Sequence, residues 1–160
     1  MPADRTPFRV SDPYDWAALL SLIRAEFAYM QGRIDPPSSM HRLTVRDIAR
    51  QAATGEVWVI EDGARPVACV FLNPRPHALY LGKLAVAASH RGHGLARQLV
   101  EVAMDRARAL NLPFLELQTR VELAENHAAF AAMGFAKTGK TAHEGYDRPT
   151  SITMQKKVHP

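Results

Sequence analysis

The residues with the clearest chemical potential form a short stretch from His90 to Leu99, HRGHGLARQL. Gly92 and Gly94 leave the backbone bare at the start of an apolar, helix-like run, so an anion can approach without meeting a Cβ atom. The first N–H groups of a helix lack partners within the helix and lie at the positive end of its dipole. Arg91 and Arg97 add positive charge. The stretch therefore predicts an anion site, and phosphate is the usual ligand of such a site.

Two familiar phosphate-binding motifs do not fit this stretch. A P-loop needs Gly-Lys-Ser/Thr, but Gly94 is followed by Leu95 and Ala96, with no lysine and no metal-binding hydroxyl. A dinucleotide fingerprint needs a third glycine where Arg97 stands, and it normally opens a βαβ unit near the start of a domain. A tight connection between a strand and a helix, without a ligand, is the structural alternative.

The chain as a whole limits the function classes. At 160 residues and 47% hydrophobic it can bury one core, so we expect a single domain over residues 1–160. No stretch approaches the roughly 20 apolar residues of a membrane span, and the polar N-terminus has no signal-peptide core. The lone Cys69, in an apolar run, predicts a buried structural thiol and a reducing, cytoplasmic compartment. A formal charge of +4 leans towards an anionic partner, but no basic run of the nucleic-acid kind is present.

The elements ahead of the glycines begin with a short strand at residues 8–10. A helix follows, and we expect Asp12 as its N-cap and Pro13 at its first position. After a loop rich in glycine and proline, a second helix is predicted to begin behind Thr44. Asp47 stands three residues later, as in a capping box.

The residues that follow have the pattern of β-strands. Residues 57–61 and 66–72 are β-branched and apolar, and residues 62–65, Asp-Gly-Ala-Arg, indicate a hairpin between them. Residues 77–86 form a third strand after a turn around residues 73–74. Antiparallel strands thus come before the glycine-rich stretch.

The second half alternates helices and strands. A helix is predicted over residues 94–110, a strand over 114–119, a helix over 125–133, and a final strand pair over 135–141 and 150–156. One apolar stripe of the first of these helices contains Leu95, Leu99, Val102, Ala103 and Leu110. The predicted order is β-α-α-β-β-β-α-β-α-β-β. This order indicates an α/β fold with a mixed, mostly antiparallel sheet flanked by helices.

Within this order the six residues RGHGLA, 91–96, match the R/Q-x-x-G-x-G/A signature of the GCN5-related N-acetyltransferases (GNAT family). The resemblance extends over nearly the whole chain, through the preceding YLGKLAV, the following FLELQT and the N-x-x-x-F-x-x-x-G-F segment from Asn126 to Phe135. It implies the GNAT fold and acetyl-CoA as co-substrate, without a metal. It also implies that the pyrophosphate lies on the amides of the glycine turn and the pantetheine arm along the preceding strand.

The resemblance assigns cofactor roles by position. The implied cofactor-binding residues are Leu84, Ala85, Val86, Arg91, Gly92, His93, Gly94, Leu95, Ala96, Arg97, Asn126 and Phe130. The Val86 N–H is expected to polarise the thioester carbonyl. Asn126 either reaches the cofactor or caps its own helix, and the two roles are compatible. Phe130 departs from the family pattern, because many relatives carry a tyrosine there that protonates the leaving thiolate, and phenylalanine has no hydroxyl.

The acceptor amine must be neutral to attack the thioester, while a lysine-type amine has a pKa of about 10.4, so a general base is useful. Glu116 occupies a place where some relatives keep a glutamate base, although a solvent-facing strand glutamate is the simpler interpretation. Glu26, near the end of the first helix, is a second candidate. Tyr146 is a third, either as a replacement acid or as part of the pocket wall.

The sequence therefore predicts an N-acetyltransferase that transfers the acetyl group of acetyl-CoA to a primary amine by direct attack on the thioester. The acceptor, a small molecule or a peptide, is not specified. Residues 30–42 and 142–149, where relatives vary, are expected to form its site. We expect no nucleic-acid or membrane partner, and a homodimer stays open. The alternative is a regulatory module of the same fold that binds an acyl-CoA without turnover.

Overall fold

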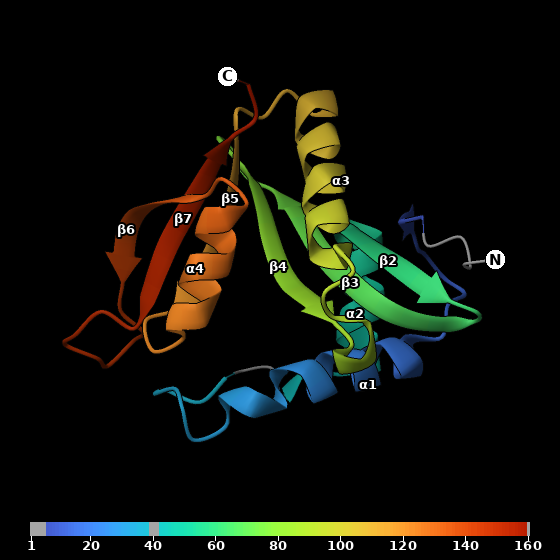
Figure 1. The fold of residues 1–160 in the computed structure, drawn as a ribbon, viewed down its shortest axis with the longest axis horizontal. Coiled ribbons are helices and arrows are strands. Elements are labelled where there is room, and N and C mark those ends of the chain that lie inside the picture. Colours follow the sequence, from blue (N-terminus) through green and yellow to red (C-terminus); the bar gives the residue numbers. More distant parts are fainter. Residues whose placement is uncertain (1–5, 39–41, 160) are drawn as a thin grey trace.

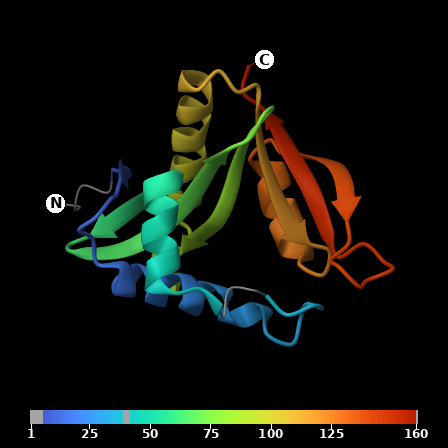
Figure 2. The same ribbon diagram turned by 180° about the vertical axis from the view of Figure 1, so that it is seen from behind.

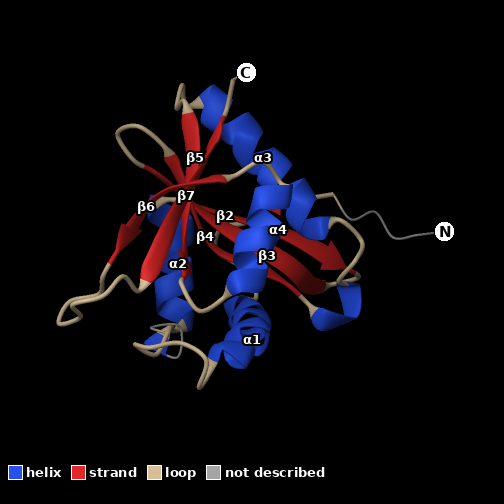
Figure 3. Cartoon of the chain, turned by 60° about the vertical axis from the view of Figure 1, so that its left-hand side comes forward, coloured by secondary structure: helices blue, strands red, loops and turns tan. Residues whose placement is uncertain are grey.

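The computed structural model describes residues 6–38 and 42–159, in which seven strands form one open sheet of order β1-β2-β3-β4-β5-β7-β6 (Figure 1). The strands are β1 (Phe8–Arg9), β2 (Glu56–Asp62), β3 (Arg65–Pro74), β4 (Leu79–Val86), β5 (Phe114–Arg120), β6 (Ala136–Thr141) and β7 (Ser151–Lys157). All neighbours are antiparallel except β4 and β5, which confirms the mixed, mostly antiparallel sheet. Figure 3 shows the strand direction turning from β3 to β7, the usual twist of such a sheet.

Helices cover both faces of the sheet. They are α1 (Trp16–Phe27), α2 (Val45–Thr54), α3 (Leu95–Ala109) and α4 (Ala124–Ala132), and the predicted order of elements is confirmed. Two opposite views place α3 and α4 on one face and α1 and α2 on the other (Figures 1 and 2). Each face has its own apolar core, one built around Leu99 and Leu115 and one around Leu19 and Ile48. Among the described residues, no helix has the length and apolar character to cross a membrane.

The feature that matters most for function is the junction of β4 and β5. Only two residue pairs join these strands, Leu79 with Leu115 and Tyr80 with Glu116. Beyond Tyr80 the two strands diverge, as the fork in Figure 1 shows. Along this stretch no backbone hydrogen-bond ladder joins β4 to β5. The sheet is therefore open between them on the side of the α3 N-terminus.

The start of α1 differs from our prediction. The helix begins at Trp16, and its N-cap is Asp15, whose side chain accepts a hydrogen bond from the Ala18 N–H at 3.0 Å. The predicted cap, Asp12, instead accepts from the Trp16 indole N–H at 2.6 Å, so Asp12 and Pro13 lie ahead of the helix. By contrast, the capping box of Thr44 at the start of α2 is confirmed in both of its hydrogen bonds.

Two further boundaries needed correction. β3 continues through Pro74, and the turn follows at residues 75–78, closed by a 2.8 Å hydrogen bond from the Arg75 N–H to the Ala78 carbonyl. Leu110 does not belong to the buried stripe of α3, since the helix ends at Ala109 and Leu110 is 37% exposed. Val102 is only partly buried. Residues of the same helix that do lie in the core are Val100, Met104 and Ala107.

Candidate active site

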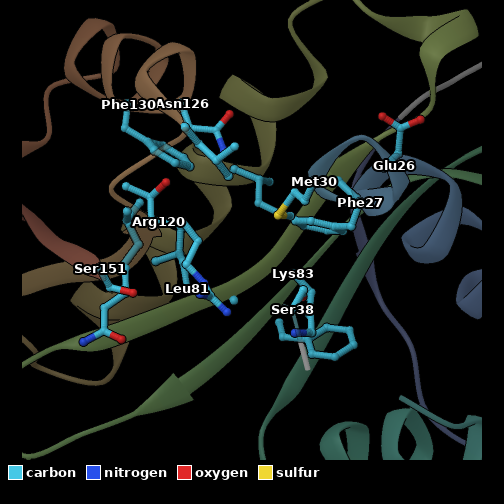
Figure 4. A pocket seen from close by; sticks show the side chains of 18 of the residues that line it. Glu26, Phe27, Met30, Ser38, Leu81, Lys83, Arg120, Asn126, Phe130 and Ser151 are labelled. Carbon is cyan, nitrogen blue, oxygen red and sulfur yellow. The ribbon is translucent and has the colours of Figure 1, made fainter. Parts of the chain in front are cut away.

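A cavity of about 910 Å³ lies where β4 and β5 diverge. Its walls come from residues 80–86 of β4, residues 117–120 of β5, the end of α1 with the following turn, and α4. In Figure 4, Asn126 and Phe130 of α4 lie across the cavity from Phe27 and Met30. Among the described residues, no three His, Cys, Asp or Glu side chains are grouped as a metal site requires.

The β4 wall contains a bulge. The register of β3 and β4 shifts between Cys69 and Phe71, and Lys83 adopts a φ of 51°, in the left-handed region that a lysine rarely enters. The Cys69 thiol spans the irregularity, because it donates to the Lys83 carbonyl at 3.3 Å and accepts from the backbone of Ala85. Burial raises the pKa of this thiol to about 12. Cys69 is thus buried as predicted, and it fixes the bulge at the cavity wall.

The glycine-rich turn lies at one end of the cavity. Gly92 and Gly94 have φ values of 81° and 76°, which only glycine adopts readily, and the space where their Cβ atoms would lie is open to 4 Å. Gly94 is the N-cap of α3 and provides no side-chain hydrogen bond to the first turn. The first N–H groups of this helix of 15 residues therefore have no side-chain acceptor from the cap residue, as an anion site at a helix N-terminus requires.

Of the predicted turn residues, only Arg91 lines the cavity itself, while Leu95 is buried in the core. Arg91 forms an ion pair with Glu26 of α1. The other Glu26 oxygen accepts from the Ala88 N–H at 3.0 Å, and the Glu26 side chain is only 11% exposed. Glu26 thus joins α1 to the segment that leads into the glycine turn.

The two predicted residues of α4 both line the cavity, next to the predicted strand residues Leu84, Ala85 and Val86. Asn126 is the third residue of the helix, whose N-cap position belongs to Leu123, so the capping role proposed for Asn126 is wrong. Phe130 contacts Phe135 edge to face at 5.8 Å between ring centroids. The Phe130 ring therefore serves the core and the cavity wall together.

The two other candidate catalytic residues, Glu116 and Tyr146, are not among the residues that line the cavity. Glu116 accepts a hydrogen bond from the Gln155 amide at 2.8 Å, and Arg75 lies 3.5 Å from its other oxygen. The Tyr146 hydroxyl donates to Asp35 at 2.6 Å, and this hydrogen bond raises the pKa of the phenol. Both side chains are engaged with protein partners.

The segment 31–37, which lies between the cavity-lining residues Met30 and Ser38, is held by polar contacts with the β5–α4 and β6–β7 connections. Asp35 accepts from Tyr146 and, at 3.0 Å, from Arg148. Arg120 of β5 donates to the Pro36 carbonyl at 2.8 Å. Described parts of the segments 30–42 and 142–149, which the sequence predicts to form the acceptor site, thus contact each other through Asp35, and residues 39–41 lie outside the described part.

The Arg33–Glu125 ion pair, at 2.7 Å, adds a contact between the same segment and α4. On the opposite loop, His143 lines the cavity and forms a hydrogen bond with Thr150 through Nδ1. Burial, assisted by the charge of Arg120, lowers the pKa of His143. His143 therefore favours the neutral imidazole, which can accept a proton.

One hydroxyl in the cavity wall lacks a partner. Thr119 is 7% exposed, and its Oγ1 has no hydrogen-bond partner among the residues that the structure describes. A buried hydroxyl left unpaired costs about 1–3 kcal/mol, so such a group in a cavity wall indicates a ligand that pairs with it. Leu117, two residues earlier on the same face of β5, packs in the core under α3 and α4, which places Thr119 on the face where Phe130 lies.

Sequence reasoning did not single out several polar side chains of the cavity, among them Lys83, Thr119 and Arg120, and it included His143 only as part of the segment 142–149. Only Lys83 carried a local signal, as the single charged residue in the apolar strand YLGKLAV. The other three reach the cavity through strand pairing and loop packing that the sequence does not display.

Comparison with known proteins adds an independent line of evidence. The model of the Acetyltransferase (GNAT) family matches residues 16–135. N-alpha-acetyltransferase 30 of Saccharomyces cerevisiae is 34% identical over 77 residues, which are 45% of this chain and 44% of that protein. The chain spans less than half the length of the curated relatives that it matches.

Solved structures share the fold over nearly the full chain. An acetyltransferase from Streptococcus agalactiae has a TM-score of 0.75 at 20% identity, covering 97% of this chain and 99% of that one. A GNAT family acetyltransferase from Elizabethkingia anophelis, with acetyl-CoA bound, has a TM-score of 0.66 at 15% identity, with coverage of 97% and 99%. At these sequence identities the structural similarity shows that the helices and strands are arranged in the same way.

Proposed function

The chain belongs to the GNAT acetyltransferase family, and on that premise we propose that it transfers the acetyl group of acetyl-CoA to a primary amine. The proposal depends mainly on one observation: the cavity follows β4 from Tyr80 to Val86 and reaches Arg91, beside the uncapped start of α3. We also propose that residues 1–160 act as one acetyltransferase domain, since strands from both halves of the chain join in one sheet.

The residues present fit acetyl-CoA. Backbone groups of Leu84, Ala85 and Val86 would hold the pantetheine arm, in the way that a sheet edge binds an added strand. The amides of residues 91–97 would hold the phosphates, helped by Arg91 and Arg97. Bound acetyl-CoA supplies an acetyl group activated as a thioester. The Thr119 hydroxyl supports this fit, because it offers a hydrogen bond inside the cavity that no group in the described part of the chain uses.

The acceptor amine has to lose a proton before or during attack. Three side chains that line the cavity have atoms that accept protons, Glu26, Glu125 and His143, and Glu125 is paired with Arg33. Glu26 already holds Arg91 and the Ala88 N–H, whereas the lowered pKa of His143 favours its neutral form. Glu116 and Tyr146 stay proposals of lower rank, since each would first have to leave its protein partners.

The test is release of the CoA thiol from acetyl-CoA across a panel of amines. The panel includes peptide N-termini, lysine side chains, free amino acids, polyamines and aminoglycosides, and the products are identified by mass spectrometry. We expect release that depends on the acceptor and a product that is heavier by one acetyl group. Tight binding of acetyl-CoA without release by any amine would instead favour the binding module without turnover.

A further inference from the structure

Positively charged side chains outnumber carboxylates in the lining of the cavity. Two carboxylates line it, Glu26 and Glu125. Each is already neutralised by an arginine, Glu26 by Arg91 and Glu125 by Arg33. Neither carboxylate is therefore available as the counter-charge of another cation in the cavity.

The cations of the cavity differ in what they contact. Arg120 donates to the carbonyls of Pro36 and Pro37, and Asp35 and Glu122 lie near enough to favour its charge. Lys83 has no acidic side chain within ion-pair distance among the described residues. Burial lowers the pKa of Lys83, and no described carboxylate offsets that effect. A partly buried ammonium without a counter-charge is costly, so a ligand that brings one gains affinity.

The position of Lys83 separates it from the phosphate end of the site. It lies at the β4 bulge, three residues before the end of the strand and eight before Arg91. At about 3.3 Å per strand residue, roughly 10 Å of extended chain lie between Lys83 and Val86 alone. In Figure 4 the Lys83 side chain lies on the side of the cavity where Ser38 and Phe27 are labelled, away from Asn126 and Phe130 of α4, and this is the side that we assign to the acceptor.

We propose that the acceptor of this enzyme is an amine that carries a carboxylate, as free amino acids do, and that Lys83 binds this carboxylate. The inference rests on the proposed function and names the class of its substrate. A single unpaired positive charge matches one carboxylate better than a phosphate monoester, which carries about −1.5 to −2 charges at pH 7.

The same ammonium has a second consequence for the acceptor. A positive charge close to the acceptor amine disfavours the protonated form of that amine. Lys83 therefore both anchors the carboxylate and favours the neutral amine that attacks the thioester. The bulge that Cys69 fixes keeps this lysine in place.

The experiment compares phenylalanine, methionine and lysine, each beside its carboxamide, in wild type, Lys83→Met and Lys83→Arg. The readouts are kcat/KM from CoA thiol release and, independently of turnover, the affinity of each compound for the CoA-loaded protein by calorimetry. Lys137→Met, an exposed lysine of β6 outside the cavity, is the matched control. The carboxamides have the more easily deprotonated amine, so a preference for the carboxylate cannot come from amine basicity.

We expect wild type and Lys137→Met to prefer the carboxylate by about tenfold or more in both readouts, as for a partly buried charge pair. In Lys83→Met the ratio should fall to near one, and Lys83→Arg should restore part of it. Equal use of both members of each pair by wild type overturns the inference while leaving acetyl transfer intact. An unchanged ratio in Lys83→Met, or an equal loss of acetyl-CoA affinity, also overturns it. Binding preference without any thiol release would leave the carboxylate site standing and refute the proposed transfer.

Discussion

The two ends of the cavity are built in different ways. At the end proposed for the cofactor, the turn of residues 91–97 leads into the start of α3 and has glycine with a positive φ at two positions. At the end proposed for the acceptor, residues 33–37 after α1 contact Arg120 of β5 and residues 143–148 before β7, and Lys83 of β4 lines the same cavity. Backbone recognition is local in the chain, whereas side-chain recognition depends on the whole fold. Variants that act on one end and spare the other test this division.

The largest effect is expected at Gly94. In Gly94→Val a branched side chain would occupy the open space above the turn, at a φ of 76°. We expect acetyl-CoA affinity to fall by about tenfold to a hundredfold, because the phosphates lose contact with the backbone amides. Calorimetric titration with acetyl-CoA measures the loss.

Gly63→Val is the matched control for backbone strain. Gly63 has a φ of 67° with equally open surroundings, but it lies in the β2–β3 hairpin, outside the cavity. Both variants should lose similar stability, about 1–2 kcal/mol for a left-handed non-glycine residue. An equal fall of acetyl-CoA affinity in both variants would show that the Gly94 effect is strain rather than contact.

At the acceptor end the next largest effect is expected at Asp35. Asp35→Ala removes the acceptor of the hydrogen bonds from Tyr146 and Arg148, so segment 31–37 loses its hold on the β6–β7 connection. We expect the KM of the amine to rise by about tenfold, with acetyl-CoA affinity within twofold of wild type. Asp105→Ala, at an exposed acid of α3, is the control. A parallel loss of acetyl-CoA affinity would refute the division between the two ends.

Substitution of Thr119 should raise the stability of the free protein and lower its affinity for acetyl-CoA. Thr119→Val removes a buried hydroxyl that has no partner, so the free protein should gain about 1 kcal/mol in its free energy of unfolding. Acetyl-CoA affinity should fall by about threefold to tenfold, because a hydrogen bond to the ligand is lost. Chemical denaturation and calorimetry give the two values. Lower stability with unchanged affinity would show that Thr119 has a partner within the protein.

The smallest effect is expected at Tyr146. Its hydrogen bond to Asp35 raises the pKa of the phenol, so Tyr146 stays protonated through the neutral range and serves the contact with segment 31–37. Tyr146→Phe should lower kcat by only about twofold to threefold, whereas loss of a general acid costs about 10²–10⁴-fold. The pH–rate profile of wild type should rise as the acceptor amine loses its proton and then level off. A bell-shaped profile whose falling limb disappears in Tyr146→Phe would make it the acid.

The difference between local backbone recognition and side-chain recognition also explains which features could be predicted from the sequence. The order of the elements, the capping box at Thr44 and the glycine turn depend on neighbouring residues, and each was predictable. Asp12 was the wrong cap because two acids compete at the start of α1, and the Trp16 indole engages the first of them. Asn126 was considered as a cap because asparagine is a common N-cap residue, but the helix begins two residues before it, at Ala124. Thr119, Arg120 and His143 gave no local signal, since their roles arise from the divergence of β4 and β5 and from the loops packed across it.

The central claim is that the turn at residues 91–97 binds acetyl-CoA through its backbone, and calorimetric titration of the wild-type protein tests it most directly. Acetyl-CoA should give saturable heat and raise the melting temperature, since a ligand of the native state stabilises it. NAD should give no saturable heat, and Gly94→Val should lose most of the acetyl-CoA signal while Gly63→Val keeps it. Absence of heat with millimolar acetyl-CoA, together with clear heat from NAD, would contradict the account.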